Sequence, residues 1–384
     1  MRGLSFEQIL KPKSSKLKLM IYLDYNATAP MRPEVKAAML EVIGEAMNPS
    51  SIHASGRKAR KLVEGARQQV LQAVNAENLI FCASGTEANN LALSQADSIA
   101  VSAIEHDSVY KFPGEKVIIN VTAQGIIDLA DLKSKIENQK SKIVSVMLAN
   151  NETGIIQRVA EVAEIAHGYG ALVHCDAVQG FGKIPLDFKA LGVDMMTVSS
   201  HKTGGPVGAA ALIHKPEIEI KPLMFGGGQE KNKRPGTENV AAIVGFGEIT
   251  KYVPRGTSVS GLRSPVTEYL ESEIRMISSD IIIFGENTER LPNTSCIAMP
   301  GVESAVQLIH FDTNGICIST GAACSSGRVE VSRVLKSMGA GAAAKNAIRI
   351  STGWATTRGE IDRFVEQWRK LYHMAGAAPL AKAR

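Results

Sequence analysis

The chain has 384 residues, of which 45% are apolar and 21% charged, as is typical of soluble globular proteins. Its net charge of +5 comes without a long basic run, which argues against a nucleic-acid groove, and no apolar run approaches the roughly 18 residues of a membrane span. The five cysteines lack zinc-type spacing, and without a secretory signal they favour a reducing cytoplasm: Cys82, Cys175, Cys296, Cys317 and Cys324.

Residues 1–20 are basic and polar and are predicted to form an extension outside the fold. Strand and helix signals then alternate from residue 21 to about residue 252. Strands are predicted at 21–25, 79–82, 98–103, 116–120, 143–148, 172–174, 193–198 and 209–213. Helices are predicted at 32–47, 57–74, from 89 onward, 128–137 and 159–169. This alternation predicts a large α/β domain, residues 21–252, with a mostly parallel sheet.

The pattern changes near Tyr252, where Pro254 and Gly256 interrupt it. Beyond this break, helices and short strands no longer alternate regularly. Helices are predicted at 266–277, 302–310 and 360–374, and strands at 281–284, 295–299, 316–319 and 348–351. Residues 253–384 are therefore predicted to form a second, smaller α+β domain.

Polar groups follow one predicted strand after another: Ser84-Gly85-Thr86, His106, Asn151, Asp176 and Lys202. Because ligands bind at the carboxyl ends of strands in open parallel sheets, these residues are predicted to share one site. Ser84-Gly85-Thr86 opens a helix whose N–H groups suit a phosphate, the alternative being an ordinary N-cap. His106 suits stacking on a flat ring, the alternative being a hydrogen-bonded core histidine.

Lys202 ends an apolar strand, so burial would depress its pKa and turn it into a nucleophilic amine. Taken alone, Ser-His-Lys after a strand also fits an ordinary surface lysine. Asp176, at the end of another apolar strand, could pair with the N–H of a protonated pyridine ring. A lysine that can form a Schiff base, together with an acidic residue for a ring nitrogen, is the combination typical of a pyridoxal phosphate site.

Several further motifs occur in the same order as in a known family. They include Tyr22-Leu23-Asp24-Tyr25-Asn26, Ser199-Ser200-His201-Lys202, Arg234-Pro235-Gly236-Thr237 and Ser319-Thr320-Gly321-Ala322-Ala323-Cys324. From about residue 22 to residue 371 the chain resembles a cysteine desulfurase of the class that feeds iron–sulfur cluster assembly, in the class-V aminotransferase family. The resemblance implies fold type I of the pyridoxal phosphate enzymes, with a seven-stranded sheet in the large domain.

The resemblance also implies a role for each motif. Lys202 would form the Schiff base with pyridoxal phosphate and move a proton of the substrate, and His106 would stack on the ring. The other cofactor contacts would come from Ser84, Gly85, Thr86, Asn151, Asp176, Gln179, Ser199 and His201, with Gln179 paired with the ring hydroxyl. Thr237 of the partner subunit would reach the phosphate in a homodimer. Asn151 and Arg349 would hold the substrate carboxylate.

Cys324 lies among glycine and small residues, which predicts a mobile segment and favours it as the reactive thiol. By resemblance, it would take sulfur from L-cysteine as a persulfide, leaving alanine. It would then pass the sulfur to an acceptor or iron–sulfur scaffold protein. The alternatives are a selenocysteine lyase on the same scaffold, a fold-type I aminotransferase, which needs no such thiol, and a non-catalytic scaffold. The sequence does not identify the acceptor.

Overall fold

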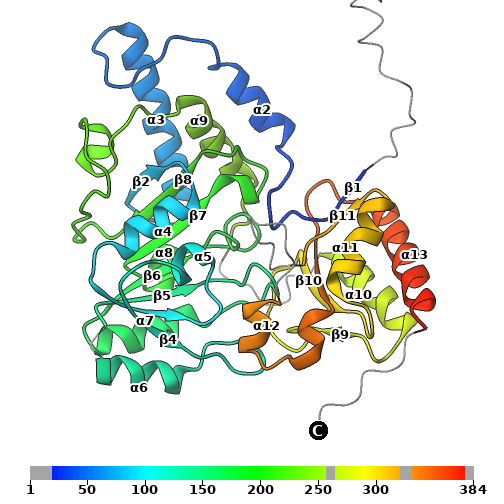
Figure 1. Cartoon of the computed structure of the whole chain (residues 1–384). Helices are drawn as coiled ribbons and strands as arrows, with labels where there is room; N and C mark the ends of the chain where they lie inside the picture. Colours follow the sequence, from blue (N-terminus) through cyan, green and yellow to red (C-terminus); the bar gives the residue numbers. More distant parts are fainter. Residues whose placement is uncertain (1–19, 140, 257–263, 321–330, 377–384) are drawn as a thin grey trace, which may run out of the picture.

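A computed structural model of the chain describes residues 20–139, 141–256, 264–320 and 331–376. These residues form a large seven-stranded sheet wrapped by helices and, beside it, a smaller sheet with its own helices (Figure 1). The predicted α/β class with a mostly parallel seven-stranded sheet is confirmed. Cys324 lies outside the described residues. Within the four ranges, no helix combines the length and apolar character needed to cross a bilayer.

The large sheet has the strand order β2-β8-β7-β6-β5-β3-β4. Its strands are β2 (Asn78–Cys82), β3 (Ser98–Ser102), β4 (Glu115–Ile119), β5 (Ile143–Met147), β6 (Leu172–Asp176), β7 (Met195–Ser199) and β8 (Ala210–His214). β8 is antiparallel to both of its neighbours, whereas the other pairs are parallel. The carboxyl ends of all strands but β8 therefore meet at one edge, where a ligand site is expected.

Both faces of this sheet are covered, which explains why its central strands are continuous apolar runs. On β3, Ala100 packs on one face and its neighbours Ile99 and Val101 on the other. The first face is covered by α3 (Ala54–Ala73), α6 (Leu129–Gln139), α7 (Val159–Gly168), α8 (Phe188–Leu191) and α9 (Val240–Ile249), with α2 (Pro33–Leu40) outside α9. The second face is covered by α4 (Gly85–Leu93) and α5 (Asp107–Tyr110).

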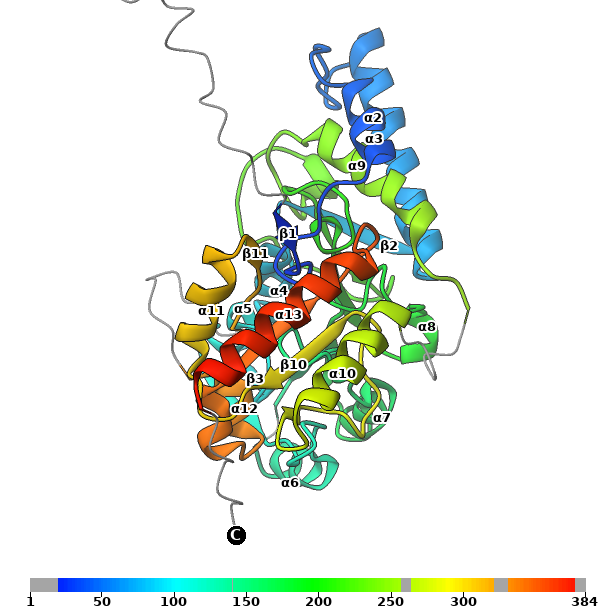
Figure 2. The ribbon, with the colours of Figure 1, turned by 90° about the vertical axis from the view of Figure 1, so that its right-hand side faces the viewer.

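The smaller sheet has the order β12-β10-β9 and is antiparallel. It consists of β9 (Ile282–Ile283), β10 (Thr294–Ala298) and β12 (Ala347–Ser351). Its helices are α10 (Pro265–Ile277), α11 (Ser304–Thr313), α12 (Arg333–Ser337) and α13 (Arg358–Met374), and Figure 2 shows α13 lying beside α10. Phe311 and Phe364 stack at 4.7 Å between ring centroids next to the fully buried Trp368. This aromatic cluster gives the smaller part a core of its own.

The N-terminal segment joins the two parts. β1 (Ile21–Tyr22) pairs in parallel with β11 (Ile316–Cys317), and Leu23 is buried in the smaller core. Asp24 then forms a bridge with Ser351 on β12 before the chain enters the large part. The domain division at residue 253 stays a prediction. The first residues assigned to the large domain nevertheless pack with the smaller one.

Local expectations differ from the structure in a few places. The helix expected at 32–47 covers only Pro33–Leu40, and it could not extend to residue 47 because Gly44 has φ +92°, which no right-handed helix accommodates. The strand expected at 21–25 covers only Ile21–Tyr22. The helix α9 was not predicted, because it is apolar on every side and buried against α2 and α3. Short 3₁₀ helices lie at Ser200–Lys202, Gln229–Asn232, Thr250–Tyr252 and Gly341–Lys345.

Candidate active site

A pocket of about 360 Å³ opens at the edge where the parallel strands end. It brings together almost all of the predicted site residues: Ser84, Gly85, Thr86, His106, Asn151, Asp176, Gln179, Ser199, His201, Lys202 and Arg349. A larger cavity of about 530 Å³, beside Arg67 and Glu230, contains none of these residues. The site predicted from the strand ends therefore exists as one pocket.

Lys202 lies in the 3₁₀ turn that follows β7. Its half-buried side chain enters the pocket, and Nζ donates a hydrogen bond to Ala27 O at 2.7 Å. Burial lowers the pKa of Lys202 to about 8, and the positive charge of Arg349 acts in the same direction. Part of the Lys202 population is therefore an uncharged, nucleophilic amine near neutral pH.

Asp176, at the end of β6, is a buried carboxylate that has no cationic partner at hydrogen-bonding distance among the described residues. Its Oδ2 accepts a hydrogen bond from Asn89 Nδ2 at 2.7 Å, and its Oδ1 accepts one from the Val178 N–H at 3.0 Å. Asn89 Nδ2 also donates to Ser108 Oγ at 2.8 Å. Two neutral donors thus hold the carboxylate in place and leave it available to a positive partner in the pocket.

His106 is exposed at the start of α5, which excludes the alternative of a core histidine. Its Nδ1 accepts the Ser108 N–H at 3.1 Å and lies 2.8 Å from Ser108 Oγ. Because Nδ1 accepts a backbone N–H, the neutral ring carries its proton on Nε2. Ser108 thereby links the orientation of His106 to the Asn89–Asp176 pair. Stacking of His106 on a cofactor ring stays a prediction.

The start of α4 has the geometry of an anion site. Ser84 is the N-cap, as the simpler interpretation of this motif predicted, with its Oγ accepting the Glu87 N–H at 3.1 Å. The Gly85 and Thr86 N–H groups occupy the first helical positions and line the pocket. Opposite them, Ser199 Oγ is buried without a hydrogen-bond partner among the described residues. A phosphate would satisfy both groups.

His201 lies at the same end of the pocket. Its Nδ1 is 3.1 Å from Thr28 Oγ1. Burial, followed by the positive charge of Lys202, lowers the pKa of His201 to about 4, so the ring is neutral near pH 7. The pocket therefore fits pyridoxal phosphate. The start of α4 and Ser199 Oγ suit its phosphate, the buried Asp176 suits its ring nitrogen, and Lys202, with its lowered pKa, suits its aldehyde.

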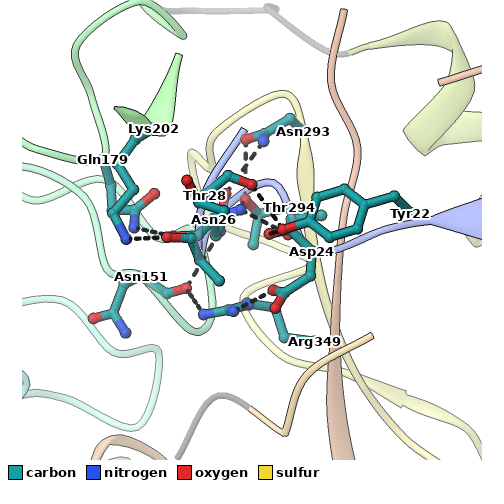
Figure 3. Close-up of polar contacts among 12 residues, drawn as sticks. Tyr22, Asp24, Asn26, Thr28, Asn151, Gln179, Lys202, Asn293, Thr294 and Arg349 are labelled. Carbon is teal, nitrogen blue, oxygen red and sulfur yellow. Dashed lines mark hydrogen bonds and ion pairs between the residues drawn. The ribbon is translucent and has the colours of Figure 1, made fainter. Parts of the chain in front are cut away.

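Arg349 reaches the pocket from β12 of the smaller sheet. Its NH2 group forms an ion pair with Asp24 Oδ1 at 2.6 Å, and NH1 donates to Asn151 O at 2.9 Å (Figure 3). Its buried Nε has no partner among the described residues. Asn26 supports this side of the pocket, because its Nδ2 donates to Asn151 O and to Thr294 Oγ1. The remaining N–H groups of the guanidinium are available for a substrate carboxylate.

Thr237 is the one described site residue that lies elsewhere. It is exposed and lines a separate pocket of about 200 Å³ with Cys82 and Arg234. Arg234 forms an ion pair with Glu87 at 2.7 Å, which attaches the Thr237 loop to the start of α4. Thr237 therefore does not contact the pocket of its own chain.

The cysteines within the described residues are free thiols of low reactivity. Cys82, Cys175 and Cys296 are buried, and Cys317 is half-buried. Burial raises the pKa of each of these thiols, so little thiolate forms near neutral pH. These four thiols are therefore poor candidates for the reactive cysteine.

Several residues of the site were missed. Asp24 and Asn26 stand inside a motif quoted above, and Asn89 lies three residues after Thr86, but none of them was given a role. Lys183, whose Nζ contacts Gln179, lies four residues after it and carries no sequence signal of its own. Closeness in the sequence to an assigned residue was the clue available for Asn89 and Lys183.

Comparison with known proteins places these features in context. Residues 21–364 match the family model described as aminotransferase class-V. The chain is 36% identical to a protein named cysteine desulfurase IscS from Dictyoglomus turgidum, over 92% of this chain and 97% of that protein. It resembles the solved NifS-like protein of Rickettsia africae with a TM-score of 0.84 and 39% identity, over 92% and 99% of the two chains. It also resembles SspA, which was solved in complex with cysteine, with a TM-score of 0.75 and 26% identity over 86% of this chain and 98% of that one.

Proposed function

Because the chain belongs to the class-V aminotransferase family and, within it, to the cysteine desulfurases, we propose that it removes sulfur from L-cysteine and releases L-alanine. The observation that carries this proposal is the meeting of Lys202, Asp176 and Arg349 in one pocket. The three groups supply a nucleophilic amine, a carboxylate for a ring nitrogen and a cation for the substrate carboxylate. A non-catalytic scaffold needs no such combination.

Bound pyridoxal phosphate would supply an aldehyde that bonds to an amine and a ring that stores an electron pair. Gly85, Thr86 and Ser199 would hold its phosphate, and Asp176 would accept a hydrogen bond from its ring nitrogen. Arg349 and Asn151 would bind the substrate carboxylate and thereby orient the substrate Cα. Lys202, with its depressed pKa, is the base placed to take the Cα proton.

The sulfur-transfer step is assigned to Cys324. Its thiolate attacks the sulfur of the substrate, so that a new S–S bond forms as the C–S bond breaks. The electron pair of that bond stays with the substrate carbon, which takes up a proton and becomes the methyl group of alanine. Cys324 is left as a persulfide, from which an acceptor protein takes the sulfur, and we place this chemistry in the reducing cytoplasm. The low reactivity of the described thiols supports this choice of residue.

The proposal is tested by incubating the cofactor-loaded protein with L-cysteine and measuring alanine and persulfide. Cys324→Ser should keep the visible absorbance of the bound cofactor and lose persulfide formation, whereas Cys317→Ser should behave like wild type. Labelled sulfur found on another cysteine would contradict the assignment. Faster selenide release from L-selenocysteine would favour the lyase alternative.

A homodimer is also part of the proposal. Gln229 Nε2 donates to Ser50 Oγ, and Gln229 Oε1 accepts the Gly236 N–H, so these loops are joined to the one carrying Thr237. The same loops expose Ile52 (87%) and Phe225 (92%), large apolar side chains that a partner surface would cover. Such a surface would bring Thr237 of the partner subunit to the phosphate.

Subunit mixing tests the shared site. Lys202→Ala and Thr237→Ala proteins should each have low activity, but a mixed dimer contains one site with both native residues. Activity should therefore recover after the two variants are unfolded together and refolded. An absence of recovery, with mixed dimers verified by mass, would show that Thr237 serves its own chain.

A further inference from the structure

Lys183 is a half-buried lysine for which the proposed chemistry has no use. Its Nζ donates to Gln179 Oε1 at 2.5 Å and to Asn26 Oδ1 at 2.6 Å. None of the ion pairs between described residues includes Lys183. Burial lowers its pKa well below the ordinary value, and the positive charges of Lys202 and Arg349 act in the same direction. A lysine buried next to two other basic residues is unfavourable unless its contacts have a structural or functional role.

The turn that contains Lys183 packs closely against the segment after β7 that contains Lys202. Gly182 has φ +76°, and a Cβ at this position would lie 2.3 Å from Thr203 Cγ2. A glycine is therefore required for the turn to approach Thr203 this closely. The turn thus brings Lys183, four residues after Gln179, into contact with Gln179 and Asn26, which both line the pocket.

The contacts of Lys183 determine how its neighbours are oriented. Nζ donates to both amide oxygen atoms, and an amine has at least two N–H donors whether or not it carries its third proton, so both amide groups turn their oxygen atoms toward Lys183. The NH2 group of Gln179 then faces away, and Nε2 donates one hydrogen to Asn26 O at 3.0 Å (Figure 3). Since Gln179 lines the pocket beside Asp176 and Lys202, its second hydrogen is available there as a donor.

We propose that Lys183 is a positioning residue that holds the Gln179 amide with its N–H group toward the pocket, where it donates to the ring oxygen of the cofactor. This inference rests on the proposed function and deepens it. Without Lys183, the amide could rotate by half a turn and present its oxygen instead. Two oxygen atoms would then face each other, which is unfavourable when the ring oxygen is ionised.

The variant that tests this is Lys183→Met, which keeps the length of the side chain and removes its donors. The ionised ring oxygen should lose a hydrogen bond. The pH midpoint of the visible absorbance of the bound cofactor should therefore rise. The dissociation constant of pyridoxal phosphate, measured by equilibrium dialysis, should increase about three- to tenfold. Lys189→Met is the matched control, because Lys189 is an exposed lysine paired only with Glu77 among the described residues, and it should change neither quantity.

A double-mutant cycle with Gln179→Ala separates positioning from a general effect of the charge. In the Gln179→Ala background, adding Lys183→Met should leave the midpoint almost unchanged. The same shift in both backgrounds would overturn the proposal, and so would an unchanged midpoint in the single variant. If Lys183→Met fails to fold, Lys183→Arg, which keeps donors, should retain the wild-type midpoint, and a raised midpoint in a folded Arg variant would overturn it.

Failure of this inference can be distinguished from failure of the proposed function. A wild-type protein that binds no pyridoxal phosphate, or makes no alanine from cysteine, contradicts the proposed function. A wild-type protein that does both, with a Lys183→Met variant identical to it in midpoint and affinity, contradicts only the role of Lys183.

Discussion

The two halves of the pocket are built in different ways. In the cofactor half, Thr86, Asp176 and Lys202 each lie at or just after the end of a strand of the large sheet, so strand order alone brings them together. In the substrate half, Arg349 on β12 of the smaller sheet donates to Asn151 O, beyond the end of β5 of the large sheet, so this half requires the smaller sheet to pack beside the large one. The cofactor half thus depends on one sheet and the substrate half on the contact between two. Changes in one half should therefore affect cofactor binding, and changes in the other the affinity for substrate.

The largest effect is expected in the cofactor half. Under the proposed function, Lys202→Ala removes both the amine that would attach the cofactor and the base, and a positioned base alone contributes about 10²–10⁴-fold. We expect no detectable alanine from cysteine and no absorbance of covalently attached cofactor.

Lys189→Ala, at an exposed lysine, should show wild-type turnover and absorbance. A normal absorbance spectrum in Lys202→Ala would show that another lysine attaches the cofactor.

The substrate half should respond more moderately. Arg349→Ala leaves the substrate carboxylate without its cation, and the loss of one partner of a buried charge pair costs about 2–5 kcal/mol. The KM for L-cysteine should rise accordingly, while the absorbance and affinity of the cofactor stay near those of wild type.

Arg358→Ala provides the comparison. Arg358, at the start of α13, lies over the ring of Tyr269 on α10 and does not line the pocket. An unchanged KM in Arg349→Ala would remove Arg349 from substrate binding. A large loss of cofactor affinity would show that the two halves are not separate.

The smallest expected effect is electrostatic: Arg349 in the substrate half changes the pKa of Lys202 in the cofactor half. Burial lowers the pKa of Lys202 from 10.5 to about 8, and Arg349 contributes to this shift. Lys202 is therefore protonated below this pH and nucleophilic above it. The rate of covalent attachment of pyridoxal phosphate should rise about tenfold per pH unit up to this midpoint and then level off.

Arg349→Gln should move this midpoint to higher pH, because a repelling positive charge is removed. Stopped-flow absorbance of cofactor-free protein mixed with pyridoxal phosphate measures it. A wild-type midpoint near the ordinary lysine value would contradict the effect of burial, and an unmoved midpoint in the variant would contradict the effect of Arg349.

Much of the cofactor half could be predicted because its signals are local. Asp176 and Lys202 end apolar strands, and Ser84-Gly85-Thr86 opens a helix, so a few adjacent residues reveal each one. The roles of Asn89 and Lys183 could not be predicted in this way. Asn89 reaches Asp176 from a helix, and Lys183 contacts Asn26 from a distant part of the chain, and neither contact leaves a pattern along the sequence.

The sequence by itself determined the alternation of strands and helices, and with it the edge at which Lys202 and Asp176 meet. The family motifs added the expected identity of the reacting groups, and the role of Cys324 stays a prediction. Only the tertiary structure decided the surroundings of these groups: the depressed pKa of Lys202, the ion pair of Arg349 with Asp24, and the orientation of the Gln179 amide. These properties depend on burial and on contacts between segments that are distant in the sequence, which form only in the folded chain.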